Sequence, residues 1–129
     1  MEALRAASDS GLHVCLGAPN VLRGASQGGN LSARAAIESG YGDILCSDYA
    51  PMTILHALFT LEALGLAPLH EAVNMVSLRA ARAVGIHGDR GSLEEGKAAD
   101  CILVERPDGV PRILKTFVAG QEVFSTCSR

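Results

Sequence analysis

One aspartate stands where the chain changes from a short apolar run to a helical pattern. Ile44, Leu45 and Cys46 form the apolar run, and Asp48 follows closely. Such a run is typical of a strand buried on both faces of a parallel sheet, so we expect Asp48 at the carboxyl end of a strand. In α/β folds ligands and catalytic groups gather at that edge. Asp48 could equally cap the helix that follows, and the local residues leave both roles open.

A second candidate site is the segment rich in small residues from Gly17 to Asn30. We expect a long loop here, whose glycines let the backbone approach a ligand closely. Its N–H groups precede a predicted helix, where anions are favoured. Arg23 adds a guanidinium suited to phosphate, and neutral hydrogen-bonding groups come from Asn20, Ser26, Gln27 and Asn30. The segment therefore suggests a phosphate-binding loop, with a plain surface connection as the alternative.

The histidines and cysteines show no metal-binding pattern. No two histidines are spaced as H-x-H or H-E-x-x-H, and no two of the 4 cysteines form C-x-x-C. Cys15, Cys46 and Cys101 lie in apolar, strand-like runs. We expect them to be buried thiols that pack in the core of a cytoplasmic protein.

Composition narrows the classes of partner. The chain has 129 residues, of which 48% are hydrophobic and 19% charged, and this predicts a globular protein with a real core. A net charge of −3 is too mild to suggest nucleic acid or an anionic membrane as a partner. No apolar run approaches the roughly 20 residues of a membrane span, and the first residues lack a signal-peptide pattern. We therefore expect a cytoplasmic protein with a small-molecule ligand.

Two strand–loop–helix units would position Asp48 and Arg23. The apolar runs 12–16 and 44–46 predict strands, and the patterns 33–39 and 52–64 predict helices, with Asn30 or Ser32 as the cap of the first helix. Alternation of strands and helices implies parallel strands with crossover helices. A further single helix is expected over 70–84.

The composition changes after Gly88. Turn-rich segments there separate three strand-like runs, 101–104, 113–118 and 121–124. A tight turn at Ala119 and Gly120 predicts that the last two strands form a hairpin. We expect an α/β part over residues 1–88 and an antiparallel β part over residues 89–129.

The second half of the chain resembles the C-terminal end of amidohydrolase-superfamily enzymes. In that superfamily a last barrel helix of the type L-x-E-A-V…A-A-R-A-x-G precedes the motif G-S-L-x-x-G-K-x-A-D. The matching residues here are Leu69–Val73, Ala80–Gly85 and Gly91–Asp100. The resemblance implies a C-terminal fragment of a (β/α)8 barrel, with about two βα units, plus antiparallel strands of a small β-sandwich domain.

The first half resembles a narrower group, the α-D-ribose 1-methylphosphonate 5-triphosphate diphosphatases of bacterial phosphonate breakdown. The similar stretches are Gly17–Asn20, Arg23–Gly24, Gly29–Ala33 and Asp43–Tyr49. The resemblance implies a metal-dependent hydrolase in which Asp48 contacts a divalent metal, with zinc expected first, and helps to activate the attacking water. The oxygens of a phosphorylated substrate would be held by Asn20, Arg23, Ser26, Gln27, Gly28, Gly29 and Asn30.

The chain departs from this group at two positions. Gln27 stands where the group usually has histidine, and Ala25 stands where glycine is usual. Glutamine can hydrogen-bond, but it neither binds metal comparably nor shuttles a proton. Activity below that of the group is therefore expected.

The chain is too short to form a whole barrel of this kind. A whole (β/α)8 barrel needs about 200 residues or more, so this chain would supply only its C-terminal piece. The H-x-H pair, the lysine or glutamate and the later histidines that hold the metals in the superfamily are not in the sequence. We expect the isolated chain to bind no metal stably and to be inactive. We also expect it to associate with itself or with the missing N-terminal part through open sheet edges.

Two alternatives stay open. One is a different amidohydrolase, either a cyclic-amide hydrolase or a deacetylase. The other is a non-catalytic fragment that serves as an interaction module.

Overall fold

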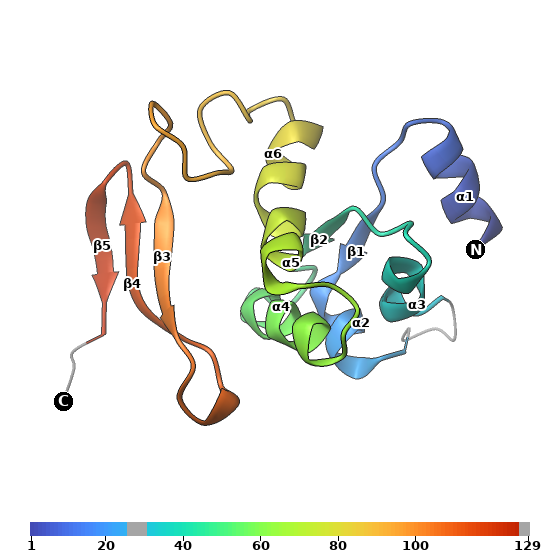
Figure 1. Ribbon diagram of the computed structural model, residues 1–129, viewed down its shortest axis with the longest axis horizontal. Coiled ribbons are helices and arrows are strands. Elements are labelled where there is room, and N and C mark those ends of the chain that lie inside the picture. Colours follow the sequence, from blue (N-terminus) through green and yellow to red (C-terminus); the bar gives the residue numbers. More distant parts are fainter. Residues whose placement is uncertain (26–30, 127–129) are drawn as a thin grey trace.

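Two short parallel strands lie among helices, and a separate antiparallel sheet follows them (Figure 1). The computed structural model describes residues 1–25 and 31–126. In chain order the elements are α1 (Glu2–Asp9), β1 (Cys15–Gly17), α2 (Ala18–Arg23), α3 (Ala33–Glu38), β2 (Ile44–Cys46), α4 (Thr53–Ala63), α5 (Leu69–Val76), α6 (Leu78–Ala83), β3 (Cys101–Glu105), the 3₁₀ turn η1 (Pro107–Gly109), β4 (Arg112–Val118) and β5 (Gln121–Ser125).

The strands β1 and β2 pair in parallel, as the strand–helix–strand order predicts. Leu16 is the register partner of Leu45. β1 begins later than the predicted strand 12–16, because the N–H of Val14 donates to the carboxylate of Asp43 at 3.0 Å rather than to a strand backbone. The carboxyl ends of β1 and β2 therefore lie at one edge.

The expected long loop after Gly17 is wrong over its first half. Ala18–Arg23 form helix α2, with Pro19 in its first turn, where a missing N–H is not costly. Ala18 and Val21 are completely buried, so packing favours a helix that the local composition did not suggest. Gly24, with φ of +77°, ends the helix.

The predicted helices around β2 are confirmed. Ser32 caps α3, since its hydroxyl accepts a hydrogen bond from the N–H of Arg34 at 3.2 Å. Helix α4 matches the pattern 52–64 to within a residue at each end.

The single helix expected over 70–84 is wrong, because it breaks at Ser77. Ser77 has φ of −125° and ψ of −87° and separates α5 from α6. Its hydroxyl donates to the carbonyl oxygen of Val73 at 2.7 Å, a local bond that competes with the helix backbone. An ion pair between Glu71 and Arg79 spans the break.

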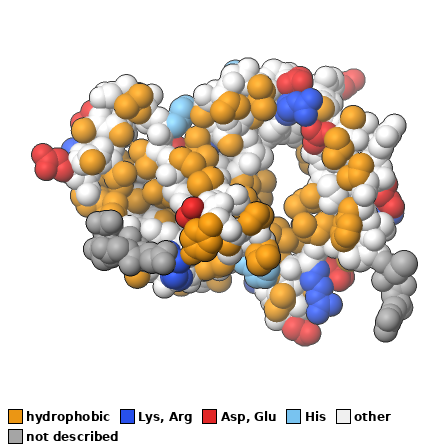
Figure 2. Space-filling model, turned by 180° about the vertical axis from the view of Figure 1, so that it is seen from behind, with side chains coloured by type: hydrophobic (Ala, Val, Ile, Leu, Met, Phe, Trp, Pro, Cys, Tyr) orange, Lys and Arg blue, Asp and Glu red, His pale blue; other side chains and the backbone are white. Residues whose placement is uncertain are grey.

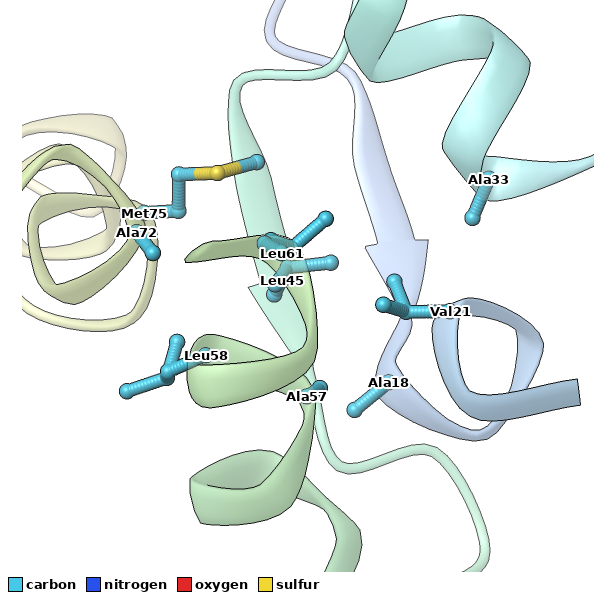
Figure 3. Packing of buried hydrophobic residues seen from close by; sticks show 9 residues of the cluster. All are labelled: Ala18, Val21, Ala33, Leu45, Ala57, Leu58, Leu61, Ala72 and Met75. Atoms are coloured by element: carbon cyan, nitrogen blue, oxygen red, sulfur yellow. The ribbon is translucent and has the colours of Figure 1, made fainter. Parts of the chain in front are cut away.

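The core forms where helices α2, α3, α4 and α5 pack against the strand pair. Figure 3 shows Leu45 of β2 and Leu61 of α4 between α5 and α2. Leu61 is fully buried, and Met75 and Val21 are the other large side chains with almost no exposed surface. The buried cluster consists of Ala18, Val21, Ala33, Leu45, Ala57, Leu58, Leu61, Ala72 and Met75. Four of these nine are alanines, so the helices approach the strands closely.

The C-terminal sheet has the order β3–β4–β5 and is antiparallel throughout, as predicted. Ala119 and Gly120 both have positive φ, +50° and +76°, as a tight hairpin turn between β4 and β5 requires. Arg106 links this sheet to α4: its guanidinium lies 5.0 Å from the ring centre of Phe59 and pairs with Glu62 at 3.0 Å.

Hydrophobic side chains reach the surface over both the helices and the sheet (Figure 2). On the sheet they are about half exposed and include Ile102, Leu103, Val118, Val123 and Phe124.

Within residues 1–25 and 31–126, no helix is both long enough and apolar enough to cross a membrane.

Candidate functional site

Asp48 follows β2 in a left-handed conformation and its side chain lies over the end of β1. Its φ is +52°, which an aspartate tolerates better than most residues. A Cβ placed on Gly17 would lie 3.0 Å from Oδ2 of Asp48 and 3.3 Å from its Cβ. The carboxylate therefore occupies space that the missing side chain of Gly17 leaves free. Asp48 is exposed at this edge of the strand pair.

The helix-cap role for Asp48 is wrong. Met52 occupies the N-cap position of α4 and makes no side-chain cap hydrogen bond. The turn before α4 is instead closed by Thr53, whose hydroxyl donates to the carbonyl oxygen of Ala50 at 2.6 Å. Asp48 is instead an exposed carboxylate at the carboxyl end of β2.

Arg23 reaches the turn that carries Asp48. It is the last residue of α2, and its guanidinium donates a hydrogen bond to the hydroxyl of Tyr49. Both side chains are exposed. Because Tyr49 directly follows Asp48, a cation and a carboxylate from two separate βα segments lie at the same edge. The guanidinium N–H groups of Arg23 that do not bond to Tyr49 could donate hydrogen bonds to an anion bound there.

Arg34 holds the end of α2 in place, a role for which the sequence contains no local signal. From α3, its Nε donates to the carbonyl oxygen of Val21 at 2.7 Å, and its NH2 nitrogen donates to that of Leu22 at 2.9 Å. Ser32 adds a hydrogen bond from its hydroxyl to the carbonyl oxygen of Gly24 at 3.0 Å. These bonds satisfy carbonyls that the helix end leaves open, and so fix the position of Arg23.

Asn20 has a partner within the fold. Its Oδ1 accepts a hydrogen bond from the N–H of Ala33 at 3.1 Å, at the start of α3. Its amide oxygen therefore helps to join α2 to α3. The other predicted ligand-binding positions, Ser26, Gln27, Gly28, Gly29 and Asn30, lie outside the described residues.

The described residues do not complete a metal centre. Within residues 1–25 and 31–126, no group of three or more His, Cys, Asp or Glu side chains is placed to hold a metal ion. A catalytic zinc site usually has three protein ligands, whereas Asp48 supplies one carboxylate. Any hydrolytic metal would need ligands from outside this part of the chain.

A cavity of about 400 Å³ lies at the opposite end of β2. Its lining includes Gly42 and Asp43, which precede the strand, whereas Asp48 follows it. The ion pair of Glu71 and Arg79 also lines it. This cavity is therefore separate from the edge that carries Asp48.

The expectation of buried thiols is wrong for Cys15 and Cys46, which are exposed, while Cys101 is half-buried. Strand alternation explains this, because Leu16 and Leu45 take the face that packs on the helices. Partial burial of the sulfur and the neighbouring thiol of Cys46 raise the pKa of Cys15 to about 11.

The amidohydrolase family model matches residues 1–123. This chain belongs to the amidohydrolase family. The resemblance inferred from the sequence motifs is thereby confirmed. Enzymes of this family generally use divalent metals.

Individual relatives narrow the comparison. The chain is 38% identical over 125 residues to the α-D-ribose 1-methylphosphonate 5-triphosphate diphosphatase of Escherichia coli, covering 95% of this chain and 33% of that enzyme. It is 28% identical over 104 residues to the imidazolonepropionase of Thermoplasma volcanium, covering 71% of this chain and 26% of that enzyme. The chain thus spans a third or less of the curated relatives it matches.

A solved structure supports the fold. An amidohydrolase from Thermotoga maritima superposes with a TM-score of 0.65 at 16% identity, over 96% of this chain and 40% of that one. At this identity the likeness shows the fold alone. It agrees with the mixed α/β architecture and with the three-stranded antiparallel sheet at the C-terminal end.

Proposed function

We propose that this chain is the C-terminal part of a metal-dependent diphosphatase of phosphonate catabolism. The complete enzyme would hydrolyse α-D-ribose 1-methylphosphonate 5-triphosphate to the 5-phosphate and diphosphate in the cytoplasm. The observation that carries the proposal is the meeting of Arg23 with the turn of Asp48, through the hydroxyl of Tyr49. The 38% identity to the E. coli diphosphatase supports the choice of substrate.

The architecture supports the place of the chain within such an enzyme. Residues 1–88 would form two βα units at the end of a (β/α)8 barrel, with β1 and β2 as neighbouring barrel strands. The buried cluster joins Leu45 of β2 to helices α2, α4 and α5, as expected where barrel helices pack on the outer face of the strands. Residues 89–129 would contribute β3, β4 and β5 to a small β-sandwich domain.

The side chains at the strand edge suit hydrolysis of a triphosphate. A divalent metal in the complete enzyme, zinc in our proposal, would supply Lewis acidity. Asp48 would accept the proton of the attacking water, since it is an exposed carboxylate at the carboxyl end of a strand. Arg23 would compensate the negative charge of the triphosphate oxygens. The isolated chain would be inactive, because no three His, Cys, Asp or Glu side chains among its described residues are placed to hold a metal ion.

A second candidate is hydrolysis of a cyclic amide. The 28% identity to an imidazolonepropionase favours it, because an imidazolone ring is a cyclic amide. A neutral ring does not require a guanidinium at the strand edge. Activity that is independent of Arg23 would therefore support this candidate over the diphosphatase.

A chimaera tests the proposal. This chain would replace the matching C-terminal third of the E. coli diphosphatase, and diphosphate release would be measured with Asp48 intact and with Asp48→Asn. We expect Asp48→Asn to lower kcat about 10²–10⁴-fold, the usual worth of a general base. Asp108→Asn is the matched control, since Asp108 is also exposed and has the same φ of +52°.

The chimaera must first be shown to be folded by circular dichroism and size-exclusion chromatography. A folded chimaera that keeps its full rate with Asp48→Asn would contradict the proposal. A folded chimaera that cleaves a cyclic amide but no triphosphate would favour the second candidate.

A further inference from the structure

The cavity of about 400 Å³ at the beginning of β2 has an apolar part formed by two helices and a loop. Ile37 of α3 and Leu66, before α5, are half-buried residues of its lining, and Met75 of α5 is 1% exposed. Ligand pockets in proteins typically measure about 300–1,000 Å³. The cavity is therefore large enough for a small molecule that carries an aliphatic side chain.

Three charged side chains, those of Asp43, Glu71 and Arg79, line the same cavity. The helix break at Ser77 brings two of them together. Eight residues of a continuous helix span about 12 Å along its axis, yet the NH2 nitrogen of Arg79 donates a hydrogen bond to Oε2 of Glu71. The cavity thus presents one cation and two carboxylates beside its apolar part.

These charged groups retain hydrogen-bonding capacity. Within residues 1–25 and 31–126, the bond to Glu71 is the only one that Arg79 donates, and a guanidinium carries several further N–H groups. Oε1 of Glu71 lies 3.7 Å from Nε2 of His70, which is beyond hydrogen-bonding distance. Asp43 accepts the N–H of Val14 at 3.0 Å through Oδ2, so its Oδ1 stays available. The cavity therefore offers a ligand both donors and acceptors.

The mixed charge of the lining selects among classes of ligand. A simple anion would be repelled by the carboxylates of Asp43 and Glu71, and a simple cation would be repelled by Arg79. A zwitterion suits both signs, because its carboxylate can accept hydrogen bonds from the guanidinium while its ammonium group donates to the two carboxylates. An aliphatic side chain on the same molecule would contact Ile37 and Leu66.

We propose that this cavity binds a free aliphatic α-amino acid. The ligand is held by charge-assisted hydrogen bonds and apolar contacts, and no covalent bond is formed or broken. The site lies at the opposite end of β2 from Asp48 and draws its lining from α3, α5 and α6. It therefore does not rest on the proposed hydrolase activity.

A titration of the isotope-labelled chain with L-leucine, followed by two-dimensional NMR, tests the site. We expect a Kd below about 1 mM, with shifts of the amide signals of lining residues such as Gly42 and Glu71. Isocaproate lacks the ammonium group and isopentylamine lacks the carboxylate. Each should bind at least about tenfold more weakly than L-leucine, because a hydrogen bond to a charged group is lost.

Matched variants separate the cavity from other ion pairs. Glu71→Gln and Arg79→Gln should each raise the Kd for L-leucine at least about tenfold. Glu62→Gln and Arg106→Gln are the controls, because Glu62 also pairs with an arginine and its side chain is 39% exposed, as is that of Glu71. The controls should change the Kd less than about twofold.

A further variant keeps the ion pair and fills the cavity. Ala67 is part of the lining, so Ala67→Leu should weaken binding of L-leucine at least about tenfold by occupying its space. It provides the test if an ion-pair variant fails to fold, and circular dichroism checks the fold of each variant. The absence of shifts at about 10 mM L-leucine, equal binding of isocaproate or isopentylamine, or shifts confined to the edge that carries Asp48 would overturn the proposal.

Discussion

Arg23 donates a hydrogen bond to the hydroxyl of Tyr49, although the two residues are separated by 26 positions in the sequence. The bond ties the end of α2 to the turn after β2. It therefore brings the guanidinium of Arg23 to the residue that directly follows Asp48. Tyr49 is, in our proposal, a positioning residue that acts on the substrate through Arg23.

Tyr49→Phe should weaken substrate binding more than turnover. Loss of the hydroxyl removes the hydrogen bond that holds Arg23 against the turn after β2, which contributes about 0.5–1.5 kcal/mol. KM of the chimaera should therefore rise about two- to tenfold, with kcat nearly constant. Tyr41→Phe is the matched control, because its hydroxyl accepts a hydrogen bond from Nε of Arg5 at 3.3 Å in an equally exposed pair. Equal effects of the two variants on KM would argue against the positioning role.

Gly17→Ala should disturb Asp48 without unfolding the chain. The backbone of Gly17, with φ of −78° and ψ of 129°, suits alanine, but the new Cβ would lie 3.0 Å from Oδ2 of Asp48. The carboxylate must move, and a misplacement of about 1 Å can reduce a rate about 100-fold. We expect kcat of the chimaera to fall while the thermal midpoint stays nearly unchanged. Gly88→Ala, where a Cβ meets nothing within 4 Å, is the control that should leave the rate unchanged.

The sequence predicted the elements whose signals are local. The apolar run before Asp48 predicted β2, and Ala119 and Gly120 predicted the hairpin of β4 and β5. Prediction from the sequence failed where a contact with residues distant in the chain determines the local structure. Helix α2 depends on the burial of Val21 against other helices, and the break at Ser77 depends on a hydroxyl that could equally have faced solvent.

The candidate site follows the same division. Asp48 and Arg23 were found from strand-end and loop chemistry, whereas Tyr49 and Arg34 act through contacts that no sequence spacing reveals. The exposure of Cys15 and Cys46 was missed because an apolar run does not show which strand face the helices cover.

Arg34→Lys should loosen the end of α2. Lysine keeps the charge but not the planar fork that reaches the carbonyl oxygens of Val21 and Leu22 at 2.7 and 2.9 Å. We expect a loss of about 1–2 kcal/mol in the free energy of unfolding, measured by urea titration. Arg90→Lys, at an exposed ion pair with Asp100, should cost less than about 0.5 kcal/mol. A smaller effect at Arg34 than at Arg90 would contradict the anchoring role.

Leu61→Ala should destabilise the chain strongly. Leu61 is fully buried at the centre of a cluster built largely from alanines, and such a cluster has few atoms that can move into the cavity. We expect a loss of about 2–5 kcal/mol in the free energy of unfolding, again by urea titration. Leu64→Ala, at a side chain that is 48% exposed, provides the comparison and should change stability by less than about 1 kcal/mol.

The thiol of Cys15 should make stability depend on pH in the alkaline range. Its pKa is raised from 9.0 to about 11, so the folded chain holds this proton more tightly than the unfolded chain does. The resulting stabilisation is fully present below pH 9.0 and is lost as the pH rises towards about 11. The urea midpoint of the wild type should therefore fall, relative to that of Cys15→Ser, as the pH rises from 9.0 to about 11.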